Sequence, residues 1–128
     1  MNLLLDTHAF IWWVNEPEKL SAKVLELCDA EENVLYLSVA SIWEIELKIH
    51  SGKLKFDEPI QTLVKSEMAD NDLKIVPIPM EHVFGVNNLP PVHKDPFDRL
   101  LIAQAIFMGA SLVSIDKLIN AYPVPVIW

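Results

Sequence analysis

The amino-acid sequence predicts an α/β fold in which a parallel sheet carries helices on both faces. Short apolar runs, typical of buried strands, alternate along the chain with longer segments of helical periodicity. Residues 100–108 are apolar on every side except at Gln104, so a helix there should be buried on the sheet. No internal repeat or linker divides the 128 residues, and we expect one domain spanning 1–128.

The first half of the chain predicts two strands and four helices. Residues 2–5 form a buried strand, and a short helix follows over 8–14 until Pro17 breaks the pattern. Ser21 caps a helix that runs to about residue 30, and residues 34–37 form the second strand. Ser38 caps a helix of two or three turns that ends at Gly52. A further helix is predicted over 57–68.

The second half predicts three strands and two helices. Residues 74–78 form a short or edge strand because Pro77 and Pro79 limit it. A helix over 80–86 and a loop over 87–94 follow. Asp95 and Pro96 begin the apolar helix, which Gly109 closes after residue 108. Strands are predicted over 111–115 and 124–128.

Composition and charge restrict the location and the partners. The single cysteine, Cys28, excludes an intramolecular disulfide, and the longest apolar stretch, 100–115, is too short and too interrupted to span a bilayer. The N-terminus lacks the pattern of a signal peptide, so we expect a cytoplasmic protein. The net charge of −8 disfavours nucleic-acid binding unless cations offset it, and it suits a basic protein partner.

Two aspartates close buried strands: Asp6 follows the run at 3–5, and Asp116 follows the run at 112–115. Sites in open α/β sheets form outside the carboxyl ends of the strands, so both are candidate site residues. Each could instead cap the helix that follows it. For either residue alone, the sequence does not decide between the two interpretations.

Asp98 also has two interpretations. With Asp95 as N-cap and Pro96 in the first turn, Asp98 completes a segment that resembles a capping box. The helix N-terminus favours an anion, so the same position should keep the Asp98 carboxylate ionised, as a metal ligand must be.

Glu44 lies in the second turn of the helix that Ser38 begins. It could form an exposed pair with Lys48, or its carboxylate could join the aspartates. Glu46 points roughly 200° away around the helix, so only one of the two glutamates can face a given cluster. Spacing alone does not decide which.

A cluster of four carboxylates predicts a bound cation. Two carboxylates ~4 Å apart repel by ~4 kcal/mol at an effective dielectric of ~20. Hard oxygen donors select Mg²⁺ or Mn²⁺, and the natural chemistry of such a site is phosphodiester hydrolysis.

Four segments carry a family resemblance: LLLDTH at 3–8, SVASIWEI at 38–45, HKDPFDRLLIAQA at 93–105 and VSID at 113–116. They resemble the PIN-domain toxins of VapBC toxin–antitoxin modules, over nearly the whole chain. The DPFDR block with its apolar helix is the most specific part. By motif position, Glu44 rather than Glu46 matches the family's acidic residue.

The resemblance implies a three-layer α/β/α fold with a short central parallel sheet. It also implies an endoribonuclease that uses Mg²⁺ or Mn²⁺, acts on RNA, forms a homodimer and has a cognate basic antitoxin. The implied metal-binding and catalytic set is Asp6, Glu44, Asp98 and Asp116. Thr7, Ser114 and Arg99 would support the site or the substrate, while the roles of His8 and His93, which flank acidic positions, stay open.

The alternative from another class is a catalytically silent PIN-fold module that works through its partner. The intact acidic set argues against it, because a silent module has no reason to keep that repulsion. Two other enzyme classes lack their motifs. A phosphatase of the haloacid dehalogenase type needs a second aspartate two residues after Asp6, where His8 stands, and a receiver domain needs an aspartate near residues 77–79.

Overall fold

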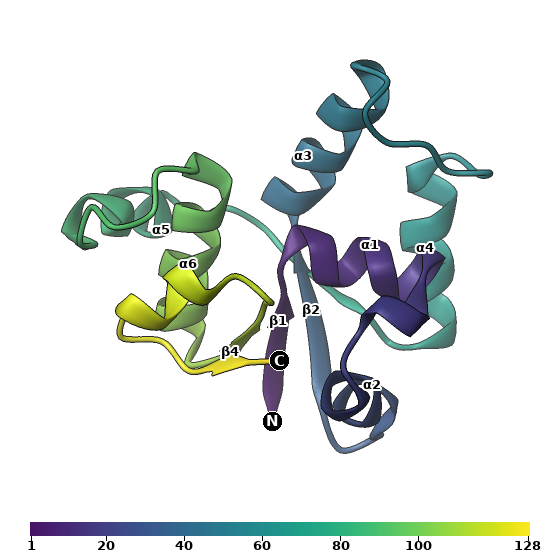
Figure 1. Ribbon diagram of the computed structural model, residues 1–128, viewed down its shortest axis with the longest axis horizontal. Coiled ribbons are helices and arrows are strands. Elements are labelled where there is room, and N and C mark those ends of the chain that lie inside the picture. Colours follow the sequence, from purple (N-terminus) through teal and green to yellow (C-terminus); the bar gives the residue numbers. More distant parts are fainter.

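The computed structural model describes residues 1–128 and shows a five-stranded, all-parallel sheet with helices on both faces, which confirms the predicted α/β class (Figure 1). The strands are β1 (Asn2–Leu5), β2 (Val34–Ser38), β3 (Lys74–Val76), β4 (Ser111–Val113) and β5 (Val126–Ile127). The α-helices are α1 (Thr7–Asn15), α2 (Ala22–Asp29), α3 (Val39–His50), α4 (Ile60–Asp70), α5 (Met80–Gly85) and α6 (Pro96–Met108). Three short 3₁₀ helices are η1 (Pro17–Lys19), η2 (Val86–Asn88) and η3 (Lys117–Ala121).

The strand order β3-β2-β1-β4-β5 places β1 at the centre. Leu3 is in register with Leu35 of β2 on one side and with Ser111 of β4 on the other. The chain therefore proceeds outward from β1 through β2 to β3, and then crosses to the opposite side of β1. Such a reversal opens a crevice at the carboxyl ends of the central strands, where open α/β sheets bind their ligands.

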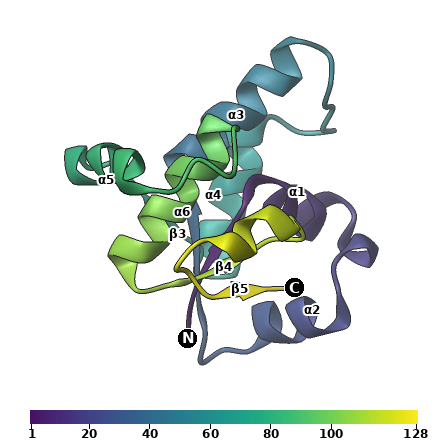
Figure 2. The same cartoon turned by 60° about the vertical axis from the view of Figure 1, so that its left-hand side comes forward.

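The sheet separates two apolar cores, which is the expected three-layer arrangement. Leu3 and Leu5 pack into a core with Phe10 of α1, whereas Leu4 packs into a second core with Leu101 of α6. Successive strand residues point to opposite faces, so an apolar run is required where both faces are covered. Figures 1 and 2 show α1, α2 and α4 on one side of the sheet and α5 and α6 on the other.

The predicted helix signals are in place. Ser21 and Ser38 accept hydrogen bonds from Val24 N–H and Ala40 N–H at the starts of α2 and α3. Gly109 ends α6 with φ 64°, a left-handed conformation that favours glycine. The third strand is at the sheet edge, as predicted, but it ends at Val76 and not at residue 78, because Pro77 has no N–H for the ladder.

Some predicted boundaries were wrong. The helix expected from residue 57 begins at Ile60, because Pro59 disfavours a helical conformation of the residue before it and is itself the N-cap, with ψ 140°. The strand expected over 111–115 ends at Val113, and η3, which follows Asp116, was not predicted. The last strand is confined to Val126–Ile127.

Helix α6 is buried on the sheet, as predicted, and its consecutive residues Leu101–Ala105 are all buried, Gln104 included. Leu101, Ile102 and Ala105 are covered, but Ile106 and Phe107 are 39% and 55% exposed. The exposed apolar side chains thus follow the buried stretch, near the C-terminal end of the helix. Neither α6 nor any other helix is long and apolar enough to cross a membrane.

Candidate functional site

Asp6 and Asp116 lie at the carboxyl ends of the adjacent strands β1 and β4, and both cap the helix that follows. Asp6 Oδ1 accepts a hydrogen bond from Ala9 N–H at 2.7 Å, and Asp116 Oδ1 accepts one from Leu118 N–H at 2.9 Å. Asp6 is buried, whereas the Asp116 side chain is a third exposed. The capping interpretation is therefore geometrically correct for both residues. It does not exclude a place in a site, because each carboxylate has a second oxygen.

Asp98 lies in the first turn of α6, where Asp95 is the N-cap as predicted. Asp95 Oδ1 accepts from Phe97 N–H at 2.8 Å and from Asp98 N–H at 3.1 Å. The reciprocal bond of a capping box, from Asp95 N–H to the Asp98 carboxylate, is not formed, because Asp95 N–H donates to His93 Nδ1 at 3.1 Å instead. The Asp98 carboxylate is consequently free to face the sheet edge.

Glu44 is the buried glutamate of α3. Its Oε1 accepts a hydrogen bond from the Thr7 hydroxyl at 2.6 Å, and its Oε2 pairs with Lys48 at 3.2 Å. Of the two interpretations of Glu44, the pair with Lys48 is formed, but it is not solvent-exposed on the glutamate side, because Glu44 is only 8% exposed. Glu46 is exposed on another side of α3, next to Ile60 and Val64 of α4.

Burial and neighbouring carboxylates raise the pKa values of two aspartates of the site, Asp6 and Asp98. Burial raises the pKa of Asp6, and the charge of Glu44 adds to the increase although a hydrogen bond from Ser114 opposes it. Burial also raises the pKa of Asp98 to about 7, with further increases from Asp95, Asp6 and Glu44. The expectation that the helix N-terminus keeps Asp98 fully ionised was wrong, because burial and like charges outweigh that interaction.

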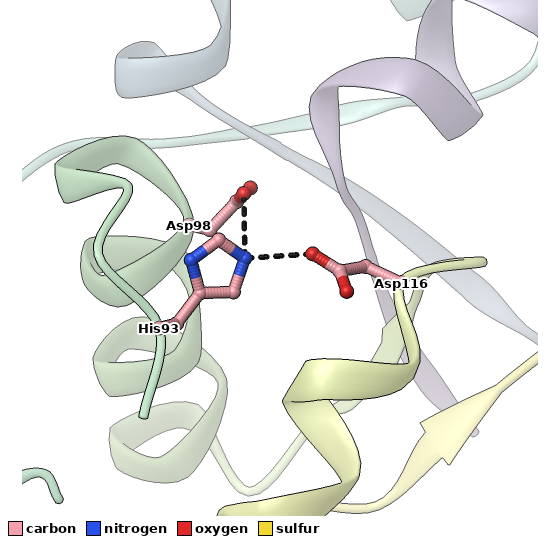
Figure 3. A group of neighbouring side chains, drawn as sticks. All are labelled: His93, Asp98 and Asp116. Carbon is pink, nitrogen blue, oxygen red and sulfur yellow. Dashed lines mark hydrogen bonds and ion pairs between the residues drawn. The ribbon is translucent and has the colours of Figure 1, made fainter. Parts of the chain in front are cut away.

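Asp116 differs from the other three. Burial raises its pKa, but hydrogen bonds from Leu118 N–H and His93, and the charges of His93 and His8, bring it below the usual value. Its link to Asp98 is the His93 ring, whose Nε2 lies 2.6 Å from Asp116 Oδ2 and 3.2 Å from Asp98 Oδ2 (Figure 3). Ser114 supports this segment, since its Oγ accepts a hydrogen bond from Asp116 N–H.

Arg99 holds the loop that carries His93. Its guanidinium donates to the carbonyl oxygens of Val86, Pro90 and His93 at 3.0–3.2 Å. A longer bond reaches Leu89 O, and Tyr122 Oη lies 3.4 Å away. Because its donors are directed at backbone oxygens, the Arg99 guanidinium is connected to the site through the loop that it holds.

The donor set of the site is dominated by carboxylate oxygens, which Mg²⁺ and Mn²⁺ prefer. The raised pKa values of Asp6 and Asp98 show that negative charge is unfavourable there without a counter-charge. A divalent cation would supply it. The residues present therefore fit such an ion.

A scan against family models matches the PIN domain over residues 3–124. This match covers nearly the whole chain and includes all four acidic positions. The chain belongs to the PIN-domain family. Ribonuclease VapC22 of Mycobacterium tuberculosis is 31% identical over 124 residues, which are 96% of this chain and 93% of that protein. The resemblance noted in the sequence motifs is thereby confirmed.

Several solved structures share the fold at low sequence identity. A chain of VapBC2 from Rickettsia felis, crystallised with a DNA fragment from its promoter, has a TM-score of 0.74 and 19% identity, covering 99% of this chain and 98% of that one. A chain of DNA-bound VapBC from Salmonella typhimurium has a TM-score of 0.68 and 14% identity, covering 99% and 97%. A chain of FitAcB from Neisseria gonorrhoeae has a TM-score of 0.66 and 16% identity, covering 98% and 96%.

The sequence left the roles of two histidines open, and in this PIN domain His93 is the one that lies at the site. It is buried and lies between two predicted site residues, whereas His8 is exposed on α1 and acts on Asp6 and Asp116 only through its charge. One feature of the sequence could have indicated where His93 lies. It stands two residues before the N-cap Asp95, and at this spacing its ring can accept a hydrogen bond from the Asp95 N–H.

The metal-free PIN domain is expected to lose stability as the pH rises from about 4 to about 7. The pKa of Asp98 is about 7 in the folded chain and 3.8 in the reference state, so between these values the folded state binds more protons than the unfolded state. The contribution of Asp98 to stability is complete below pH 3.8 and is lost as the pH rises through about 7. Its slope is at most ~1.4 kcal/mol per pH unit.

Urea denaturation in EDTA at several pH values measures this dependence. Asp98→Asn should flatten it, whereas Asp57→Asn, which changes an exposed aspartate, should leave it unchanged. Parallel pH profiles for wild type and Asp98→Asn would show that Asp98 titrates normally.

Proposed function

We propose that this PIN domain is a Mg²⁺- or Mn²⁺-dependent endoribonuclease and the toxin of a type II toxin–antitoxin module. The observation that carries the proposal is the approach of three carboxylates at the carboxyl edge of the sheet. Burial raises the pKa of Asp6 and the charge of Glu44 adds to the increase, and burial raises the pKa of Asp98 with further increases from the charges of Asp95, Asp6 and Glu44. The name of the relative VapC22 supports ribonuclease activity in particular.

Asp6, Glu44 and Asp98 would hold the cation, with Asp116 beside Asp98. When bound, the ion supplies an activated water and stabilises charge on the phosphate. Thr7 fixes the Glu44 carboxylate through the 2.6 Å hydrogen bond, and Ser114 hydrogen-bonds to Asp6. These hydroxyl groups orient the carboxylates, so we assign Thr7 and Ser114 a supporting role.

Single-stranded RNA should be cut by the purified protein in Mg²⁺ or Mn²⁺, and cutting should stop in EDTA and resume when excess metal is restored. A labelled oligonucleotide assay measures this, with a DNA strand of the same sequence in parallel to separate RNA from DNA chemistry. Cleavage that persists in EDTA would indicate a contaminating nuclease.

The second candidate is a catalytically silent PIN module that acts through its partner. Such a protein would bind its partner and show no cleavage of RNA at any metal concentration. The acidic site disfavours it, because the charges of Asp6, Glu44 and Asp98 repel one another and a silent module has no reason to keep that repulsion.

A basic antitoxin fits the charge of this chain, which is −8. An arginine of the partner placed among the carboxylates would supply the missing positive charge and bind a carboxylate bidentately. The solved relatives named VapBC support a partner of this kind. Addition of the cognate basic antitoxin should therefore stop cleavage, and unimpaired cleavage by the formed complex would contradict this part of the proposal.

A homodimer would cover an exposed apolar surface. Large apolar side chains of α3, α5, α6 and the segment before α5 are 37–65% exposed. They are too many to be the single, scattered apolar residues that are normal on a protein surface. These side chains are Val39, Trp43, Leu47, Ile78, Met80, Val83, Phe84, Ile106 and Phe107. Sedimentation equilibrium should give twice the chain mass of 14.5 kDa, and the single-chain mass at micromolar concentration would contradict a homodimer.

A further inference from the structure

His93 lies between two carboxylates that come from separate elements. Asp98 belongs to α6, and Asp116 follows β4 and begins η3. Figure 3 shows the ring pointing between them, with one nitrogen, Nε2, facing both. The Nε2–Oδ2 distances are 2.6 Å for Asp116 and 3.2 Å for Asp98, so the stronger hydrogen bond goes to Asp116. The ring is 9% exposed.

The hydrogen bond at the other ring nitrogen fixes the tautomer. Asp95 N–H donates to His93 Nδ1 at 3.1 Å, and a backbone amide can only donate. Nδ1 therefore carries no proton, and in the neutral ring the proton is on Nε2. A protonated nitrogen has no lone pair for a metal ion. Although His93, Asp98 and Asp116 are close enough to form a three-ligand group, this geometry makes His93 a donor to carboxylates.

The surrounding contacts hold the ring in this place. His93 N–H donates to Tyr122 Oη at 2.7 Å, and its carbonyl oxygen accepts from Arg99 at 3.2 Å. Asp116 is fixed in turn, because Leu118 N–H donates to Oδ1 and His93 donates to Oδ2. The charges of Asp6 and Glu44 interact with the carboxylate of Asp98, whereas the groups whose charges interact with Asp116 include His93 and His8. The ring is thus the direct connection of Asp116 to the other carboxylates.

We propose that His93 is a positioning residue whose Nε2–H holds Asp116 against Asp98, as an outer donor of the site and not as a metal ligand. The proposal rests on the divalent-metal site of the proposed function. Outer donors orient ligating carboxylates, and their removal usually weakens metal binding by ~10–100-fold. The same loss is expected here.

Two substitutions separate the donor from the rest of the side chain. His93→Asn retains an acceptor for Asp95 N–H, as Asn does in turns of this spacing, but it is too short to reach Asp116. His93→Gln places an amide N–H at about the reach of Nε2. His50→Gln, at an exposed position at the end of α3, is the matched control.

Mn²⁺ affinity, measured from the free-ion electron paramagnetic resonance signal, tests the proposal without reference to activity. We expect binding ~10–100-fold weaker in His93→Asn, largely restored in His93→Gln and unchanged in His50→Gln. Wild-type affinity in His93→Asn would overturn the proposal. Equal weakening in both His93 variants would also overturn it, because the donor would then not be the feature that matters.

Ring nitrogen spectra of the wild-type protein give a second test that needs no variant to fold. Two-bond ¹H–¹⁵N correlations should show the Nε2–H tautomer of His93 without metal and with saturating Mg²⁺. A change to the Nδ1–H tautomer with Mg²⁺ would identify Nε2 as a ligand and refute the outer-donor role. Failure of the proposed function gives a different result, in which metal binds with the expected His93 dependence and RNA remains intact.

Discussion

Replacing Asp98 by asparagine is expected to reduce RNA cleavage by more than ~100-fold, because loss of an outer donor alone costs ~10–100-fold and Asp98 would be a ligand. The metal-free variant should be as stable as wild type or more stable at neutral pH, since the substitution removes an unfavourable buried charge next to Asp6 and Glu44. The lost interaction with the α6 N-terminus, ~0.3–1 kcal/mol, opposes this gain. Cleavage rates and urea midpoints measure the two effects.

Glu46→Gln is the control for this experiment, because Glu46 is an exposed carboxylate on α3, the helix that carries Glu44. It should retain wild-type activity, and its inactivation would mean that the wrong glutamate had been assigned. If Asp98→Asn stayed active and became less stable, Asp98 would be part of the helix start and not part of a metal site.

Arg99→Ala is expected to destabilise the protein by ~2–4 kcal/mol and to reduce metal binding together with stability. The guanidinium donates to three carbonyl oxygens at 3.0–3.2 Å, and hydrogen bonds to charged groups contribute ~1.5–3 kcal/mol each without being additive. Loss of these bonds frees the segment that places His93. Urea denaturation gives the first effect, and Mn²⁺ titration gives the second.

Arg99→Lys and Lys94→Ala complete the comparison. Lysine offers a point charge where the planar fork of arginine reaches several carbonyl oxygens, so Arg99→Lys should recover less than about half of the lost stability. Lys94 is exposed in the same loop, and its removal should change stability by less than ~0.5 kcal/mol. A change of this small size in Arg99→Ala would show that the loop is held by other contacts.

The sequence was sufficient to predict those structural elements whose determinants are neighbouring residues. Strand β1 is an apolar run closed by Asp6, and α6 begins at Asp95–Pro96, so both could be read from neighbouring residues. Glu44 could be preferred over Glu46 only through the family resemblance, because helix spacing fixes a relative direction and not which side meets the sheet edge. The Thr7–Glu44 hydrogen bond, which joins α1 to α3, supplies that missing information.

The features that sequence reasoning missed depend on tertiary contacts. His93 reaches Asp116, 23 positions away, because α6 and β4 meet on one side of the sheet. The pKa of Asp98 was misjudged for the same reason. The helix N-terminus is visible in the sequence, whereas burial and the approach of Asp6 and Glu44 are properties of the folded chain.

The position of β1 between β2 and β4 has a consequence for biosynthesis. Asp6 enters the ribosome's exit tunnel early, but its neighbours Asp98 and Asp116 are made far later, and the β1–β4 pairing that aligns both ends needs residues 111–113. Closing so long a loop is a late event in folding. A nascent chain that has not yet reached β4 therefore lacks part of the acidic set. Up to that point in translation, the completed site is absent from the chain that the ribosome is making.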